Sequence, residues 1–165
     1  MTGNHNDDIK KLAKLIHGID ICMMTTMAED GSLRSRPMST QKDEFNGQLW
    51  FFTDADAGKV FEIQRDRHVN LSYADPSSSR YVSVSGRAVL VRDKAKIKEL
   101  WTPPLKAWFP DGVDDPKIAL LRVDVEQAEY WDTPGGAVVH LIGFAKATLT
   151  GDRYEPGEHA KVNLA

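Results

Sequence analysis

The sequence predicts a mainly β domain, built as an antiparallel barrel of six or seven strands with a few covering helices. Short segments rich in β-branched and aromatic residues recur along the chain, and turn residues separate them. The length of 165 residues, with 41% hydrophobic and 27% charged residues, is that of one globular domain. We therefore expect a single domain over residues 1–165, with residues 1–8 as a disordered tail and 152–165 as a second tail.

The first half of the chain begins with a predicted helix from Asp7 or Asp8 to His17, where apolar residues recur at helical spacing. The predicted strands are Ile21–Ala28, Leu33–Glu44, Gln48–Thr53 and Val69–Tyr73. Pro37 cannot donate a ladder hydrogen bond, which indicates an edge or a bulge in the second strand. Asn46-Gly47 is a strong hairpin signal between the second and third strands.

A helix is expected from about Ala57 to Asp66, with Asp54 or Asp56 as its cap. The later elements are a strand over Tyr81–Val91, a helix over Lys94–Trp101, a loop over Leu105–Pro116, two closing strands over Ile118–Val125 and Glu126–Trp131, and a helix over Ala137–Leu149. Gly86 interrupts the alternation of the long strand, which indicates a bulge. Gly151 is positioned to end the last helix.

Composition excludes several functions. The net charge of −3 disfavours a nucleic-acid binder, which usually carries a basic excess. Cys22 is the only cysteine, so no intramolecular disulfide forms, and the five histidines show no metal-ligand spacing. No signal peptide and no membrane-spanning run is recognisable, so we expect a cytoplasmic protein without membrane or nucleic-acid partners.

Three segments together suggest a site for a planar, phosphorylated ligand. They are Arg34–Met38, then Leu49–Thr53 followed six residues later by Lys59, and Glu129–Asp132. Arg36 and Lys59 can supply charge for a phosphate, and a helix start can supply backbone donors. Each segment alone has a simpler explanation, such as plain core or a solvated surface. Asp54 and Asp56 would also repel a phosphate unless they face away.

In this order, the segments resemble the pyridoxamine-5′-phosphate-oxidase-like FMN-binding split barrels, and more closely their general stress protein branch. The branch's traits are found in Ala107–Gly112, Asp114–Pro116 and Glu129–Asp132. The resemblance implies a split barrel that forms a homodimer, with two FMN sites lined by both subunits. The cofactor-binding residues it suggests are Arg36, Met38, Phe52, Thr53, Lys59, Tyr81, Trp108 and Trp131.

The sequence also departs from the true oxidases of this family. Those enzymes grip the substrate phosphate with an arginine after the tryptophan that matches Trp131, and here no arginine occurs between Trp131 and Arg153. Ala57-Gly58 replaces a serine-arginine pair, which removes two phosphate contacts. We therefore expect a stress-type FMN protein, an oxidoreductase of an unknown small substrate, and not a pyridoxamine-phosphate oxidase. A non-enzymatic flavin-binding or sensing module, or a barrel that uses F420 or haem, is the alternative. No catalytic residue and no metal ligand is identified.

Overall fold

The structure is a computed structural model that describes residues 5–41, 43–133, 135–153 and 157–165. Its strands are β1 (Ile21–Met27), β2 (Leu33–Ser39), β3 (Gln48–Asp54), β4 (His68–Asp75), β5 (Arg80–Val91), β6 (Ile118–Asp132) and β7 (Glu158–Asn163). Its helices are α1 (His5–Ile16), α2 (Gly58–Arg65), α3 (Lys94–Leu100) and α4 (Gly136–Thr150), with short 3₁₀ turns at Pro76–Ser78, Pro103–Ala107 and Gly112–Asp114.

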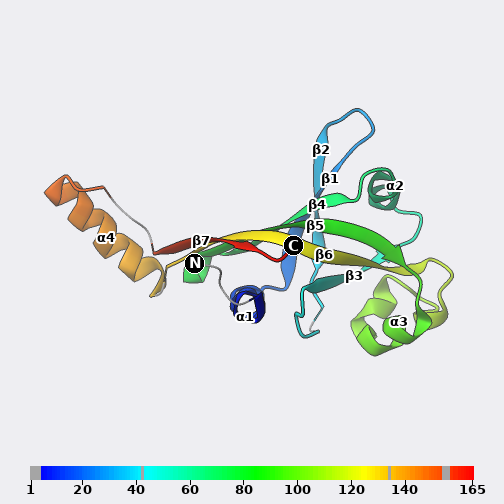
Figure 1. Ribbon diagram of the computed structural model, residues 1–165. Helices are drawn as coiled ribbons and strands as arrows, with labels where there is room; N and C mark the ends of the chain where they lie inside the picture. The colour runs from blue at the N-terminus through cyan, green and yellow to red at the C-terminus, as the bar shows by residue number, and fades with distance from the viewer. Residues whose placement is uncertain (1–4, 42, 134, 154–156) are drawn as a thin grey trace.

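The strands form one curled antiparallel sheet in the order β2-β1-β4-β5-β6-β3. The long strand β6 pairs with β3 along its first half and with β7 along its second half. Helices α2 and α3 lie toward one end of the sheet, whereas α4 projects from the other (Figure 1). The predicted fold class, a mainly β split barrel with helical covers, is confirmed.

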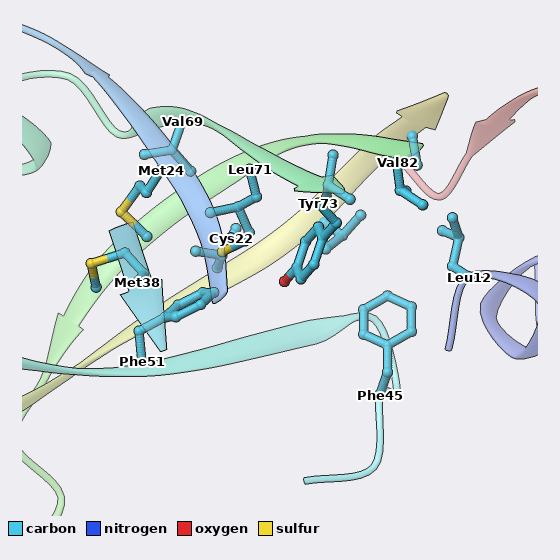
Figure 2. Close-up of a cluster of buried hydrophobic side chains, with 14 of the residues drawn as sticks. Leu12, Cys22, Met24, Met38, Phe45, Phe51, Val69, Leu71, Tyr73 and Val82 are labelled. Atoms are coloured by element: carbon cyan, nitrogen blue, oxygen red, sulfur yellow. The ribbon is translucent and has the colours of Figure 1, made fainter. Parts of the chain in front are cut away.

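The inner face of the sheet carries the main hydrophobic core. Alternate residues of β1, β4 and β5 point to this side, as the strand period of two requires. Figure 2 shows Met24, Leu71 and Phe51 converging there, and each is at most 1% exposed. A second, smaller cluster lies under α3 and is built around Ile97, Phe109, Ile118 and Leu120.

The prediction that the second and third strands form a hairpin is wrong. The Asn46-Gly47 turn exists, because the Asn46 side chain accepts from the Gln48 amide and Gly47 has φ +103°. However, β2 ends at Ser39, and β3 pairs with β6 instead. After β2 the chain crosses the barrel end, where Phe45 is buried in the core, and this long-range packing outweighs the local turn signal.

The two closing strands are one continuous strand, β6, with an irregularity at its middle. Ser85 pairs with Gln127 but Gly86 pairs with Val125, so Glu126 is the extra residue. The bulge expected at Gly86 is therefore present, with its additional residue on the partner strand. A Cβ on Gly86 would lie 2.3 Å from the Asp124 carbonyl oxygen, so only glycine fits.

The chain ends also differ from the predicted tails. Helix α1 already begins at His5, within the expected N-terminal tail, and β7 forms within the expected C-terminal one. The signal for β7 was the alternation of Ala160, Val162 and Leu164, which pack on the main core. None of the helices in the described part of the chain is both long and apolar enough to cross a bilayer.

Candidate functional site

Arg36 lies in a partly buried ion-pair cluster that joins β2, β1 and α2. Its guanidinium donates to Glu62 Oε2 at 2.9 Å and to the Thr26 hydroxyl, which in turn donates to Glu62. Arg34, more exposed, lies 3.5 Å from the other Glu62 oxygen. The bond from Thr26, with the nearby Arg36 and Arg34, holds the pKa of Glu62 below its usual range. Glu62 therefore compensates much of the charge of Arg36.

Lys59 lies one helical turn before Glu62 and is half-buried. Burial lowers the pKa of Lys59, and the nearby charge of Arg36 lowers it further, while Asp54 partly opposes both. Among the described residues Lys59 has no ion-pair partner. The cluster therefore holds more cationic than anionic groups at this point, which favours an anionic ligand.

The start of α2 has no side-chain cap. The N-cap is Ala57, in an extended conformation, and its carbonyl oxygen accepts from the Val60 amide at 2.9 Å, whereas no side chain accepts from the amides of Gly58 and Lys59. The expectation that Asp54 or Asp56 caps the helix is wrong, because Asp54 instead accepts from the Asp56 amide at 2.8 Å. A Cβ on Gly58 would meet nothing within 4 Å, so the space before the helix is open. Free N–H groups at a helix start attract anions.

The other candidates on β2 and β3 are buried or, in the case of Phe52, partly buried. Met38 is 6% exposed and belongs to the main core, where Figure 2 shows it between Met24 and Phe51. Phe52 points to the opposite face from Phe51 and packs in the second cluster, with its ring 6.3 Å from that of Trp101. Thr53 is 3% exposed, and its hydroxyl donates to the Asp54 carbonyl oxygen at 3.1 Å.

Tyr81 and Trp131 form an exposed aromatic row with a residue that the sequence reasoning missed. Tyr81 pairs with Trp131 across β5 and β6, and Trp131 pairs with His159 on β7. The Trp131 and His159 rings are stacked, with centroids 5.1 Å apart and planes 9° from parallel. His159 Nε2 lies 2.6 Å from Glu129 Oε1, which fixes the imidazole. His159 was missed because its segment was expected to be a tail.

Within one chain, the aromatic row and the cationic cluster do not meet. Arg36 is in register with core residues of the inner face, whereas Tyr81 and Trp131 lie on the outer face. Strands β1 and β4 separate β2 from β5, which corresponds to about 14 Å at normal strand spacing. Tyr81 and Trp131 therefore do not cover the start of α2 within the same chain.

Trp108 lies apart from both groups. It follows the 3₁₀ turn Pro103–Ala107, and its side chain is 80% exposed. It lines a cleft of about 520 Å³ between this turn and the end of β2, near Ser39. No metal-binding group of His, Cys, Asp or Glu residues occurs in the parts of the chain that the structure describes.

The glutamate in the cationic cluster gives a testable pH dependence. We expect Glu62→Gln to lower the free energy of unfolding at pH 7 by about 1–3 kcal/mol, because the charge-assisted bonds to Arg36 and Thr26 weaken. The folded pKa of Glu62 is depressed, so its contribution is present above the unfolded pKa and disappears as pH falls through the folded value. The difference between the two proteins should therefore shrink below about pH 4.3.

Urea unfolding of the ligand-free protein at pH 7, 5, 4 and 3 measures this difference. Glu99→Gln is the matched control, since Glu99 also pairs with a cation, Lys96 at 3.0 Å, but is 60% exposed. A difference for Glu62→Gln that stays constant over the whole pH range would contradict the prediction.

A curled antiparallel sheet of seven strands with helical covers is the fold that this chain shares with solved split-barrel proteins. The chain belongs to the pyridoxamine 5′-phosphate oxidase like family, which it matches over residues 7–155.

Individual relatives place the chain near the general stress proteins. It is 31% identical to protein bli-3 of Neurospora crassa over 153 residues, which are 87% of this chain and 73% of that protein. A solved putative general stress protein 26 from Jannaschia sp. superposes with a TM-score of 0.76 at 25% identity, covering 97% of this chain and 99% of the other. The general stress FMN/FAD binding protein of Xanthomonas citri gives 0.66 at 29% identity, covering 77% and 89%.

Proposed function

We propose that this chain is an FMN-binding protein of the general stress type, which binds the cofactor between two copies of itself. The observation that carries the proposal is the start of α2, where Lys59 is half-buried, without an ion-pair partner among the described residues, and beside free helix N–H groups. A phosphate at this point would gain charge-assisted hydrogen bonds and the helix dipole. The related Xanthomonas citri protein is described as FMN/FAD binding, which supports the same cofactor.

The chain's own residues have distinct parts in this site. Lys59 and the first N–H groups of α2 would hold the phosphate, and Arg36 would add long-range attraction while it stays paired with Glu62. Tyr81 and Trp131 of the second copy would cover the ring system from the outer face. Bound FMN would supply one- and two-electron transfer, and the protein would supply orientation and electrostatics. With these residues, the protein would catalyse the oxidation or reduction of a small molecule.

Extraction of the bound ligand tests the cofactor. The purified protein is denatured, and the released small molecules are weighed by mass spectrometry and examined by absorbance. FMN in about one copy per chain is expected. F420 or haem in its place would overturn the choice of cofactor. If nothing is released, titration of the protein with FMN decides, and no binding at micromolar FMN would overturn the proposal.

Turnover separates an enzyme from a flavin-storing or sensing module. The FMN-loaded protein is mixed anaerobically with NADH or NADPH, and flavin absorbance is followed. Reduction and subsequent reoxidation over many cycles by an added acceptor supports an oxidoreductase. Binding without reduction supports the non-enzymatic alternative.

The outer face of the sheet predicts a stable homodimer. Strands β1, β2, β5 and β6 expose large apolar side chains on this face, namely Ile21, Met23, Leu33, Tyr81 and Trp131. The projecting helix α4 exposes four more, namely Leu141, Ile142, Phe144 and Leu149. So many exposed large apolar side chains are typical of a protein that buries part of its surface in an interface. Sedimentation velocity at 1–10 µM should give twice the mass of the 18.4 kDa chain.

A pair of variants tests which surface is used. Met23→Lys places a charge at an exposed apolar position of β1 on the outer face and should shift the protein toward monomer. Ala95→Lys, at an exposed position on α3, should leave the dimer unchanged. A stable wild-type monomer, or equal effects of both variants, would contradict this interface.

Pyridoxamine 5′-phosphate should not be a substrate. The segment after Trp131 offers no arginine before Arg153, so a doubly charged substrate phosphate would lack a cationic partner. We expect no pyridoxal phosphate in an aerobic assay with the FMN-loaded protein. Turnover of about 1 s⁻¹ or more would contradict this expectation.

A further inference from the structure

A cavity at the end of the barrel lies outside the proposed flavin site. Its volume is about 570 Å³, within the range of small-molecule sites. It is enclosed by the end of α1, the segment that leads into β1, the segment between β2 and β3, and the side of β3. None of the residues assigned above to the cofactor lines it.

A buried tyrosine hydroxyl lies at the inner end of this cavity. Tyr73, on β4, is 2% exposed, yet its hydroxyl has no hydrogen-bond partner among the described residues. Figure 2 shows the hydroxyl directed toward the space between Phe45 and Phe51, both of which line the cavity. A buried polar group without a partner is rare in native proteins and indicates a missing ligand or water.

The state of this hydroxyl is settled by its surroundings. Burial raises the pKa of Tyr73, and the neighbouring Cys22 thiol raises it further, so the phenol stays protonated. The contact with Cys22 lacks the geometry of a hydrogen bond, and sulfur is a weak acceptor. Tyr73 therefore offers one unused donor to whatever occupies the cavity.

The cavity has apolar walls and a mouth that carries carboxylates, and together these favour a ligand that is partly apolar and positively charged. Ile16, Leu49 and Trp50 make much of the lining apolar. Among the described residues that line the cavity, the titratable groups at the mouth are His17, Asp20, Asp43 and Glu44. Asp43 is paired with Lys96 at 2.9 Å, whereas Asp20 and Glu44 have no ion-pair partner among the described residues. These carboxylates repel an anion and attract a cation.

We infer that this cavity binds a small amphiphilic cation, with a hydrogen-bond acceptor at its inner end on Tyr73 and an amine at the mouth beside Asp20 and Glu44. The site is separate from the flavin site, so occupation of one leaves the other free. The inference does not depend on the proposed cofactor, and both ligand-free and FMN-loaded protein serve for its test.

Three matched probes test the chemistry. 4-Acetylbenzylamine has an amine and a ketone acceptor, 4-ethylbenzylamine lacks the acceptor, and 4-acetylbenzoate replaces the amine by a carboxylate. Binding is followed by calorimetry and by the tryptophan fluorescence of the protein, to which Trp50 in the cavity wall contributes. We expect the ketone amine to bind about three- to tenfold more tightly than the ethyl amine, as one hydrogen bond implies, and the carboxylate to bind most weakly.

Two variants locate the two contacts. Tyr73→Phe should abolish the preference for the ketone without lowering the melting temperature, because the hydroxyl has no partner to lose in the free protein. Asp20→Asn should weaken both amines and leave the ketone preference intact. Glu29→Gln, at an exposed carboxylate outside the cavity, is the control and should change neither.

The result that overturns the inference is equally definite. It is wrong if no probe binds at 5 mM, if the ketone and ethyl amines bind equally to the wild type, or if Tyr73→Phe keeps their ratio. Displacement of the probe by FMN would also overturn it, since the cavity would then belong to the flavin site.

Discussion

Gly86→Ala is expected to lower the free energy of unfolding by about 3 kcal/mol. The added Cβ would lie 2.3 Å from the Asp124 carbonyl oxygen and 3.2 Å from the Val123 side chain. Both neighbours belong to β6, whose backbone is held by β5 and, in this half, by β3. The strand must therefore shift for the methyl group to fit, which disturbs the central ladder of the sheet.

Urea unfolding of the ligand-free variant measures the change. Gly58→Ala is the matched control, because a Cβ there would meet nothing within 4 Å and the residue lies in the first turn of α2. That substitution should be neutral or raise the free energy of unfolding by about 0.4–1 kcal/mol. Equal stabilities of the two variants would show that the close approach of β6 to Gly86 is incorrect.

Lys59→Ala is expected to weaken FMN binding by about 10- to 150-fold, if the phosphate lies at the start of α2. The lost contact is a charge-assisted hydrogen bond of about 1.5–3 kcal/mol. Lys59 makes no ion pair with a described residue, so its removal should leave the fold intact. Arg36→Ala is a less clean test, since it would also leave Glu62 with a weaker partner.

Titration of the ligand-free protein with FMN, followed by flavin fluorescence, gives the affinities. Lys98→Ala is the control, because it removes an exposed lysine of α3 and changes the net charge by the same amount as Lys59→Ala. The affinity of that control should match the wild type. If both lysine variants bind FMN equally well, the phosphate does not lie at Lys59 and the proposed orientation of the cofactor is wrong.

Most elements of the fold were predictable from local patterns. The alternation of apolar residues defined β1 and β5, and the helical spacing with Gly151 at its end defined α4. These patterns reflect the side-chain periods of strands and helices, which need no information from distant residues. The bulge at Gly86 was also predictable, because an isolated glycine in a long strand marks a close approach.

The composition of the candidate site was predictable in part. Arg36 and Lys59 do lie close together, as the ligand chemistry required, although Glu62 already pairs with Arg36. That pairing was not predictable, since it joins β2 to a helix 26 residues further along the chain. The stacking of His159 on Trp131 likewise depends on the pairing of β7 with β6.

Local patterns therefore specified most of the strands and helices, although not β7, and the charges and aromatic residues that a phosphorylated ligand would need. Which strands pair was settled by long-range packing. Asn46-Gly47 makes a turn, yet β3 lies beside β6 because burying Phe51 and Phe45 in the common core outweighs the turn's preference. The same packing leaves the Tyr73 hydroxyl without a partner at the end of a cavity, a feature that no sequence pattern announces.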